Sequence, residues 1–96
     1  MAYGLEIKRT AQRSLLRLAR TAPRDLERIE AAIDQFALDP RPPGAAKIRA
    51  RPPVWRLRVG GYRVIYAVFD AEQLVVIGKV ERRTERTYSD IEELFR

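Results

Sequence analysis

The sequence contains neither cysteine nor histidine, the side chains that most often bind transition metals in proteins. Disulfide and thiolate chemistry are therefore excluded, and a transition-metal site is not expected. Any general acid or base must be a carboxylate, a lysine, a tyrosine or an arginine. We expect a protein that needs no cofactor.

Long apolar runs are also missing, since none approaches the roughly 18 residues that a membrane span needs. The N-terminal residues Met-Ala-Tyr-Gly-Leu-Glu do not precede a long apolar segment, so a signal peptide is not predicted. We expect a cytoplasmic protein with no membrane partner. With 96 residues, 46% of them hydrophobic, the chain can bury one small core, which predicts a single domain over residues 1–96.

Acidic residues are the minority among the charged side chains: 13 oppose 19 lysines and arginines, for a net charge of +6. The imbalance is greatest between Lys47 and Tyr66, where six residues are basic and none is acidic. Such a segment favours a polyanionic partner such as nucleic acid, or an acidic protein. Its basic residues are Lys47, Arg49, Arg51, Arg56, Arg58 and Arg63.

The clearest structural pattern covers residues 54–66, where two runs of alternating side chains flank Gly60-Gly61. A glycine pair can take the positive φ angles of a tight two-residue turn, which predicts a β-hairpin. One hairpin face is then apolar and is expected to pack in a core, whereas the other face carries arginines. The predicted cross-strand pairs are Val59 with Tyr62, Arg58 with Arg63, Leu57 with Val64 and Trp55 with Tyr66.

The arginine face would comprise Arg56, Arg58 and Arg63 beside Ile65. Like charges directly across a strand pair cost up to about 1 kcal/mol, and an anionic ligand would offset this cost. The alternatives are a solvated face and a docking surface for an acidic protein. On the apolar face, we expect the aromatic residues Trp55, Tyr62 and Tyr66 to pack in the core rather than stack on bases.

The flanking segments predict a helical hairpin packed on a sheet. Alternation at Tyr3, Leu5 and Ile7 indicates a short first strand. Thr10 is predicted to cap a helix that runs to about Arg20, and Pro23 to open a second helix that ends at Asp39-Pro40. The predicted buried stripes are Ala11, Leu15, Leu18 and Ala19 on the first helix, opposite a solvent face that includes Arg13 and Arg17, and Leu26, Ile29, Ile33 and Phe36 on the second.

After the hairpin, residues 70–73 read as a turn and residues 74–80 as an apolar strand in the middle of the sheet. Ser89 and Glu92 have the spacing of a capping box, which predicts a short C-terminal helix. The fold class is α+β, with the order β-α-α-β-β-β: a helical hairpin on a largely antiparallel four-stranded sheet.

The charge-dense segment Glu81 to Tyr88 follows the last predicted strand, and such strand ends often hold binding groups. Arg82 and Arg86 are predicted to contact RNA; alternatively, they pair with Glu81 and Glu85. Tyr88 either stacks on an unpaired base, for about 1–3 kcal/mol, or packs on the sheet at the start of the terminal helix. Arginines that bind phosphate, together with an exposed tyrosine, fit single-stranded RNA.

These residues resemble a known family. The chain is similar to the RelE branch of the RelE/ParE toxin superfamily at Tyr3 and Leu5, Lys47-Ile-Arg49, Trp55-Arg-Leu-Arg58, Gly61-Tyr-Arg-Val-Ile-Tyr66 and Arg82-Arg83 with Tyr88-Ser89. The similarity covers nearly the whole chain, and its most specific part is the Gly-Tyr-Arg string followed by the basic strand end and the tyrosine. The resemblance implies the same order of elements and a toxin that enters the ribosomal A site and cuts messenger RNA.

The resemblance also implies roles for particular residues. Arg56 and Arg58 occupy positions where RelE-type toxins often have two catalytic lysines. Arg63 matches an arginine that stabilises the phosphate, Arg83 an arginine proposed as general acid, and Tyr88 a tyrosine that orients the nucleotide. The implied reaction is attack of the ribose 2′-OH on the adjacent phosphate with departure of the 5′-oxygen, and it requires no metal.

The two arginines at the lysine positions leave the general base open. A lysine can lose its proton among neighbouring cations, whereas an arginine stays protonated. Lys47, Tyr88 and Glu81 are candidates; alternatively, the ribosome positions the RNA so that a strong base is dispensable.

The partners that the resemblance implies are the ribosome, messenger RNA and a RelB-like antitoxin, through which the toxin–antitoxin complex binds its operator DNA. Two other functions remain open at this point. One is a ParE-like inhibitor that binds DNA gyrase without enzymatic activity on the same fold. The other is a basic module that binds RNA or the ribosome without cleavage.

Overall fold

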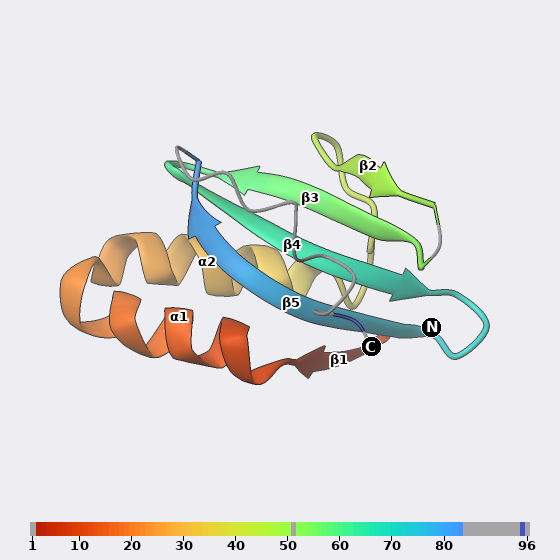
Figure 1. Ribbon diagram of the computed structural model, residues 1–96, viewed down its shortest axis with the longest axis horizontal. Coiled ribbons are helices and arrows are strands. Elements are labelled where there is room, and N and C mark those ends of the chain that lie inside the picture. Colours follow the sequence, from red (N-terminus) through yellow and green to blue (C-terminus); the bar gives the residue numbers. More distant parts are fainter. Residues whose placement is uncertain (1, 51, 84–94, 96) are drawn as a thin grey trace.

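The computed structural model describes residues 2–50, 52–83 and 95. Two helices and five strands form an α+β fold, which confirms the predicted class (Figure 1). The predicted C-terminal helix and Tyr88 lie outside the described residues. The elements are β1 (Gly4–Ile7), α1 (Arg9–Thr21), α2 (Pro23–Gln35), β2 (Ala46–Arg49), β3 (Val54–Val59), β4 (Tyr62–Phe69) and β5 (Leu74–Arg82).

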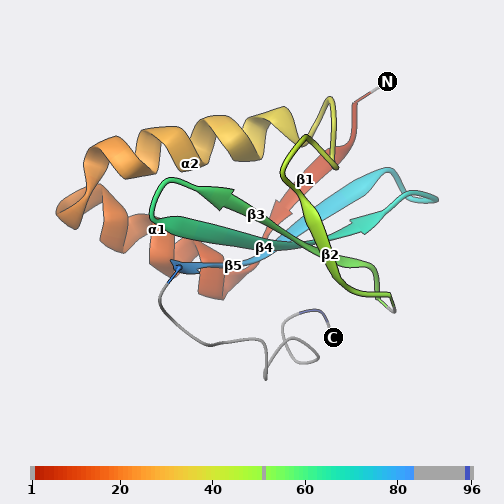
Figure 2. The ribbon, with the colours of Figure 1, turned by 90° about the horizontal axis from the view of Figure 1, so that it is seen from above.

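The strands form one sheet in the order β1-β5-β4-β3-β2. β1 runs parallel to β5, and the other neighbours are antiparallel. The β3–β4 hairpin has the predicted register, with Arg58 opposite Arg63 and Trp55 opposite Tyr66. In the turn, Gly60 adopts a φ of +59°, a conformation that favours glycine. The turn lies near Arg28 of α2, at the end of the molecule where α1 joins α2 (Figure 2).

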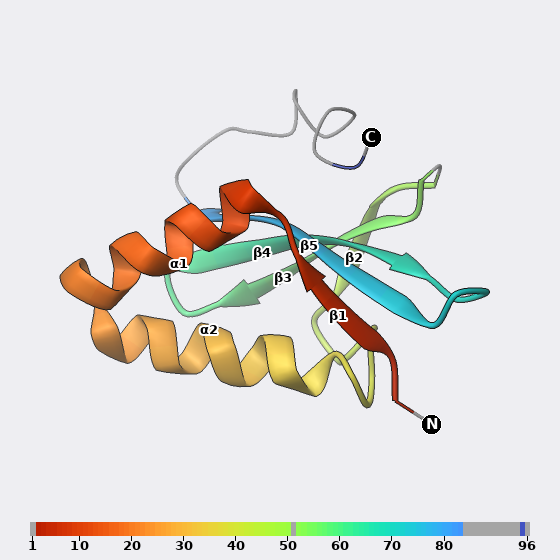
Figure 3. The same ribbon diagram turned by 90° about the horizontal axis from the view of Figure 1, so that it is seen from below.

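Both helices cover the same face of the sheet, and the view from below shows them on the near side (Figure 3). Ile29, Ile33 and Phe36 are buried, as predicted. Phe36 stacks on Tyr66 of β4 with ring centroids 4.1 Å apart. Each fully buried side chain of this size contributes about 1.5–3 kcal/mol, so this layer fixes the helices on the hairpin. Trp55 and Tyr62 pack against the same core.

Three local predictions about the elements were wrong. The sheet has a fifth strand, β2, which the sequence did not predict because its four residues give little local signal. The segment becomes a strand because its backbone pairs with β3. Ala19 of α1 is exposed. Thr10 is not a cap: Lys8 is the N-cap, and the Thr10 hydroxyl donates a 2.6 Å hydrogen bond to the carbonyl oxygen of Gly78.

The bulge at Gly78 explains that hydrogen bond. The pairing of β4 with β5 shifts between Ile65 and Tyr66, which lie opposite Lys79 and Ile77, so Gly78 has no partner in β4. A bulge of this kind changes the direction of the following side chains. On the face of the sheet away from the helices, Phe95 packs on a second cluster that contains Val54, Ile65 and Ala67.

In the described part of the chain, neither helix is both long and apolar enough to cross a membrane.

Candidate functional site

A cavity of about 370 Å³ opens beside the β3–β4 turn, on the sheet face away from the helices. It is lined by Arg58, Gly61, Arg63 and Arg83. Arg58 and Arg63 are cross-strand partners, and Arg83 follows the last residue of β5. The fold therefore brings together three of the five residues predicted to be catalytic, from three separate segments.

Arg63 is held in place from two sides. Its Nη2 donates a 2.7 Å hydrogen bond to the carbonyl oxygen of Arg83, and its Nε lies 3.7 Å from Glu81 Oε1. The backbone N–H of Arg83 in turn donates to the carbonyl oxygen of Gly61 at 2.9 Å. These contacts fix the end of β5 against the hairpin turn and orient the Arg63 guanidinium before any ligand arrives.

Glu81 is buried at 3% exposure, beneath this cationic surface. Its Oε2 lies 3.8 Å from Lys79 Nζ, while Oε1 faces Arg63. A buried carboxylate is retained only where cations and hydrogen bonds compensate its lost hydration. Glu81 therefore serves as the counter-charge that lets Arg63 and Lys79 share one face of the sheet.

Sequence reasoning missed Lys79 because it lies within an apolar run that reads as a fully covered strand. The Gly78 bulge sets Lys79 opposite Ile65 and Glu81 opposite Arg63, which puts both side chains on the arginine face. A glycine inside an otherwise apolar strand was the available signal, since it often marks a bulge.

The remaining predicted site residues are dispersed. Arg56 lies opposite Ile65 on the arginine face, although it does not line the cavity, and Arg49 lies opposite Val54. Lys47 pairs with Trp55, and its Nζ is 5.7 Å from the Trp55 ring centroid, on the helix-covered side. Arg51, Arg86 and Tyr88 lie outside the described residues.

Arg82 lies opposite Tyr62 and points to the helix side of the sheet. There it borders a groove of about 300 Å³ between α1 and the end of β5. Arg13 and Arg17, which the sequence places on a solvent face, are exposed and line the same groove. Two consecutive arginines, Arg82 and Arg83, thus face different surfaces.

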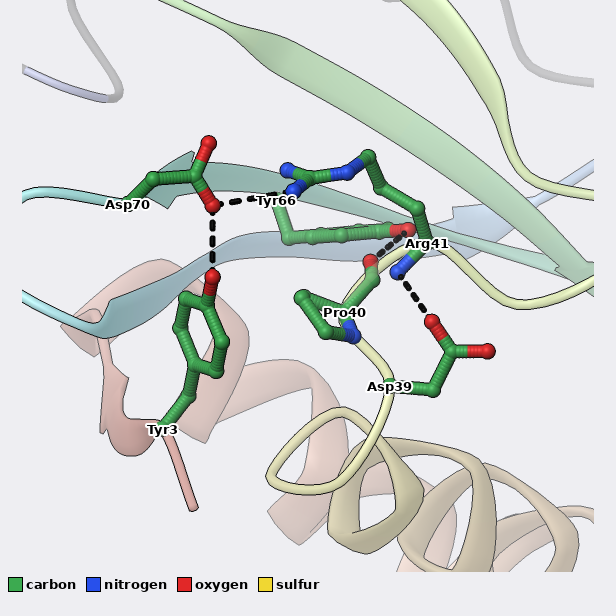
Figure 4. Close-up of polar contacts among 6 residues, drawn as sticks. All are labelled: Tyr3, Asp39, Pro40, Arg41, Tyr66 and Asp70. Carbon is green, nitrogen blue, oxygen red and sulfur yellow. Dashed lines mark hydrogen bonds and ion pairs between the residues drawn. The ribbon is translucent and has the colours of Figure 1, made fainter. Parts of the chain in front are cut away.

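A separate polar network lies at the other end of β4 (Figure 4). Asp70 accepts a 2.6 Å hydrogen bond from the Tyr3 hydroxyl and pairs with Arg41 Nη2 at 2.9 Å. The hydrogen bond from Arg41 is the main cause of the lowered pKa of Asp70, and the bond to Asp70 raises the pKa of Tyr3. This network joins the loop after α2 to the β4–β5 turn and to the segment before β1.

The buried end of that network is Tyr66, whose hydroxyl donates a 2.8 Å hydrogen bond to the carbonyl oxygen of Pro40 (Figure 4). Burial raises the pKa of Tyr66 far above its ordinary value of 10.0. Arg41 also lies over the Trp55 ring, 5.8 Å from its centroid. These residues stabilise the fold, and they lie away from the arginine cavity.

The chemistry of the cavity follows from its donors. Arginine stays protonated and can hold phosphate oxygens through two parallel hydrogen bonds. Preorganised cations of this kind stabilise negative charge that develops on a reacting phosphate. Among the described residues the cavity has no lining carboxylate, so its arrangement suits an anion.

Comparison with known proteins identifies relatives over most of the chain. The family model described as the ParE toxin of type II toxin–antitoxin systems, parDE, matches residues 5–87. No curated protein sequence matches the chain.

Among solved structures, the RelBE2 toxin–antitoxin complex of Mycobacterium tuberculosis is 31% identical, with a TM-score of 0.62, over 86% of this chain and 100% of the other. The intact E. coli RelBE complex is 28% identical, with a TM-score of 0.68, over 88% and 100%. The archaeal RelE–RelB complex of Pyrococcus horikoshii OT3, 23% identical over 90% and 100%, shares the fold with a TM-score of 0.72.

Proposed function

The chain belongs to the ParE toxin family of type II toxin–antitoxin systems and to the RelE-like branch of that superfamily, and from this membership we propose that it cleaves messenger RNA on the ribosome. The observation that supports this activity is the cavity that Arg58, Arg63 and Arg83 line together, from three segments of the chain. A protein that only bound another protein would not need three arginines around one cavity that suits an anion.

In the proposed reaction, the ribose 2′-OH attacks the adjacent phosphate, the bond to the 5′-oxygen breaks, and a 2′,3′-cyclic phosphate forms. Arg63 stabilises the charge that accumulates on the phosphate, since its guanidinium is already oriented by Glu81 and the Arg83 carbonyl. The Arg83 guanidinium donates toward the leaving oxygen. Arg58 completes the cationic side of the cavity.

Two of the candidate bases fit this site poorly. The Glu81 carboxylate, 1% exposed, faces Arg63 and Lys79, and Glu81 is not among the residues that line the cavity. Lys47 is next to Trp55 on the helix-covered side. The proposal therefore leaves Tyr88 as the candidate that accepts the 2′-OH proton. Alternatively, the ribosome positions the RNA so that a strong base is dispensable and water accepts the proton, since such positioning can be worth several kcal/mol.

We propose further that an antitoxin restrains this toxin. The similar E. coli structure is a RelBE toxin–antitoxin complex. An acidic, partly disordered antitoxin would be attracted by the net charge of +6 and could cover the arginine face by folding upon it. Binding of the complex to operator DNA would then occur through the antitoxin.

Inhibition of DNA gyrase is the second candidate function, and the matching ParE family model favours it. A gyrase inhibitor acts as a binding surface, so it would tolerate the loss of any one cavity arginine without losing a chemical step. The two functions therefore differ in the products that they leave behind.

The discriminating experiment supplies the purified chain to programmed ribosomes and, in parallel, to gyrase with plasmid DNA. Primer extension on the ribosome-bound message should show new 5′ ends that are absent without the protein, while gyrase supercoils DNA normally. Intact message together with gyrase-dependent DNA breaks would refute the ribonuclease and support the inhibitor. Ribosome binding without cleavage would leave only a non-cleaving RNA-binding module.

A further inference from the structure

Helix α1 presents a row of cations along its exposed side. Arg9, Arg13, Arg17 and Arg20 are spaced by four, four and three residues, so they lie on one side of the helix, and all four are exposed. The helix contains no acidic residue. At 1.5 Å per residue, the row extends over about 16 Å.

The positive charges of this row destabilise helix α1 when it is considered by itself. Like charges four residues apart repel one another, and cations in a first turn oppose the helix dipole, which favours acidic residues there. Among residues 2–50, 52–83 and 95, no ion pair involves these four arginines. An anionic ligand would neutralise these charges and relieve their mutual repulsion, which favours its binding.

The row borders the groove between α1 and β5. Arg13 and Arg17 line it from the helix, and Arg82 and Tyr62 line it from the sheet. The hydroxyls of Thr10, Ser14 and Thr21 donate to backbone carbonyls. The cationic residues that line the groove are Arg13, Arg17, Lys79 and Arg82. Glu81 also borders the groove, but its carboxylate is engaged by Arg63 and Lys79.

We propose that this groove and the α1 row form a second anion-binding surface, which docks the phosphate backbone of a folded RNA. It lies on the helix side of the sheet, whereas the arginine cavity lies on the other side, and the consecutive Arg82 and Arg83 link the two surfaces around the end of β5. The row extends over about 16 Å, a length that can contact successive phosphates of a duplex segment. The surface goes beyond the proposed cleavage because it binds without reacting.

RNA fits this surface better than an acidic protein does. Protein partners gain most of their affinity from apolar or aromatic anchors in desolvated pockets. The apolar lining residues Leu18 and Val80 are buried in the core. The large apolar residue that α1 exposes is Leu16, which lies three residues after Arg13 and four before Arg20. Leu16 therefore distinguishes the two kinds of partner, since its removal would weaken a protein complex and leave binding to phosphate unchanged.

The test compares two double variants of the full chain that remove the same charge. Arg13→Gln/Arg17→Gln removes the groove side of the row, and the control Arg24→Gln/Arg28→Gln removes two arginines from α2. The probes are a short RNA duplex and programmed ribosomes, titrated over a range of salt concentrations. We expect the first variant to bind at least about tenfold more weakly, with a salt slope smaller by about 1 for each phosphate that is no longer neutralised, and the control to resemble the parent.

The ribosome titration separates docking from cleavage. For Arg13→Gln/Arg17→Gln, the ribosome concentration at half-maximal cleavage should rise while the maximal rate changes little. Duplex binding with a reduced slope, but no cleavage by any variant, would support this surface and refute the proposed ribonuclease. The proposal would be overturned if the two double variants behaved alike, if the parent failed to bind the duplex, or if Leu16→Ala weakened binding as strongly as the arginine changes.

Discussion

The side chain of Arg63 donates a 2.7 Å hydrogen bond to the carbonyl oxygen of Arg83, a residue 20 positions further along the chain. This bond joins the central hairpin to the end of β5 at the point where the cavity opens. The polar end of the Arg63 side chain is thus fixed by a backbone group rather than by another flexible side chain. Because the Arg63 guanidinium is already oriented, it can stabilise charge on the phosphate without reorganisation when the phosphate arrives.

Replacement of Arg63 or Arg83 with alanine should slow cleavage far more than it weakens ribosome binding. Loss of one preorganised charge-stabilising donor typically raises a barrier by about 2–4 kcal/mol. Single-turnover cleavage at saturating ribosomes measures this effect. Arg24→Ala, on the exposed surface of α2, is the matched control and should cleave at the parent rate. Parent-like cleavage by both cavity variants, with folding unchanged, would show that the site is wrongly assigned.

Arg58→Lys tests whether a base is useful in the cavity. The substitution keeps the positive charge but introduces an amine whose pKa neighbouring cations can lower, whereas arginine remains protonated. We therefore expect the variant to retain or exceed the parent cleavage rate, with the gain growing as pH rises. A large loss of activity at every pH would mean instead that the bidentate geometry of Arg58 is needed.

Glu81→Gln should reduce both stability and activity. The substitution removes the buried carboxylate that Arg63 and Lys79 face, and loss of a partner to charged groups costs about 1–3 kcal/mol. Urea unfolding measures the loss of stability. Single-turnover cleavage measures the loss of activity that follows when Arg63 is less firmly oriented. Glu72→Gln, in the exposed β4–β5 turn, is the control for loss of one negative charge. Parent stability in Glu81→Gln would contradict the counter-charge role.

The Asp70 network predicts a pH dependence of stability. The pKa of Asp70 is lower in the folded chain than the ordinary 3.8, chiefly because Arg41 donates a hydrogen bond to the carboxylate. The contribution of Asp70 is therefore present above that ordinary value and is lost as pH falls through the lowered pKa. Asp70→Asn should melt below the parent at neutral pH and converge with it in strong acid. In an Arg41→Gln background, the effect of Asp70→Asn at neutral pH should be smaller.

Local sequence patterns sufficed for the elements that local chemistry determines. The period-two alternation around Gly60-Gly61 predicted four cross-strand pairs between Trp55 and Tyr66, and the hairpin forms all four. The apolar stripe of α2 and the turn before Leu74 followed from periodicity and turn chemistry in the same way. The arrangement of Arg58 opposite Arg63 was therefore visible before the fold was known.

The features that sequence reasoning missed depend on contacts between distant segments. β2 becomes a strand by pairing with β3. The Thr10 hydroxyl donates to the carbonyl oxygen of Gly78 instead of capping α1. The same bulge brings Lys79 and Glu81 to the arginine face. Lys47 is close to Arg49 in sequence, yet it lies beside Trp55 because the β2–β3 pairing sets its direction.

The most direct measurement is the cleavage rate of one messenger RNA, bound in programmed ribosomes and free in the same buffer, at equal concentrations of the chain. We expect rapid cleavage on the ribosome and nearly intact free RNA, because ribosomal positioning of the 2′-OH in line with the phosphate is worth several kcal/mol. Equal cleavage of both RNAs, or of neither, would contradict the proposal that this toxin is a ribosome-dependent ribonuclease.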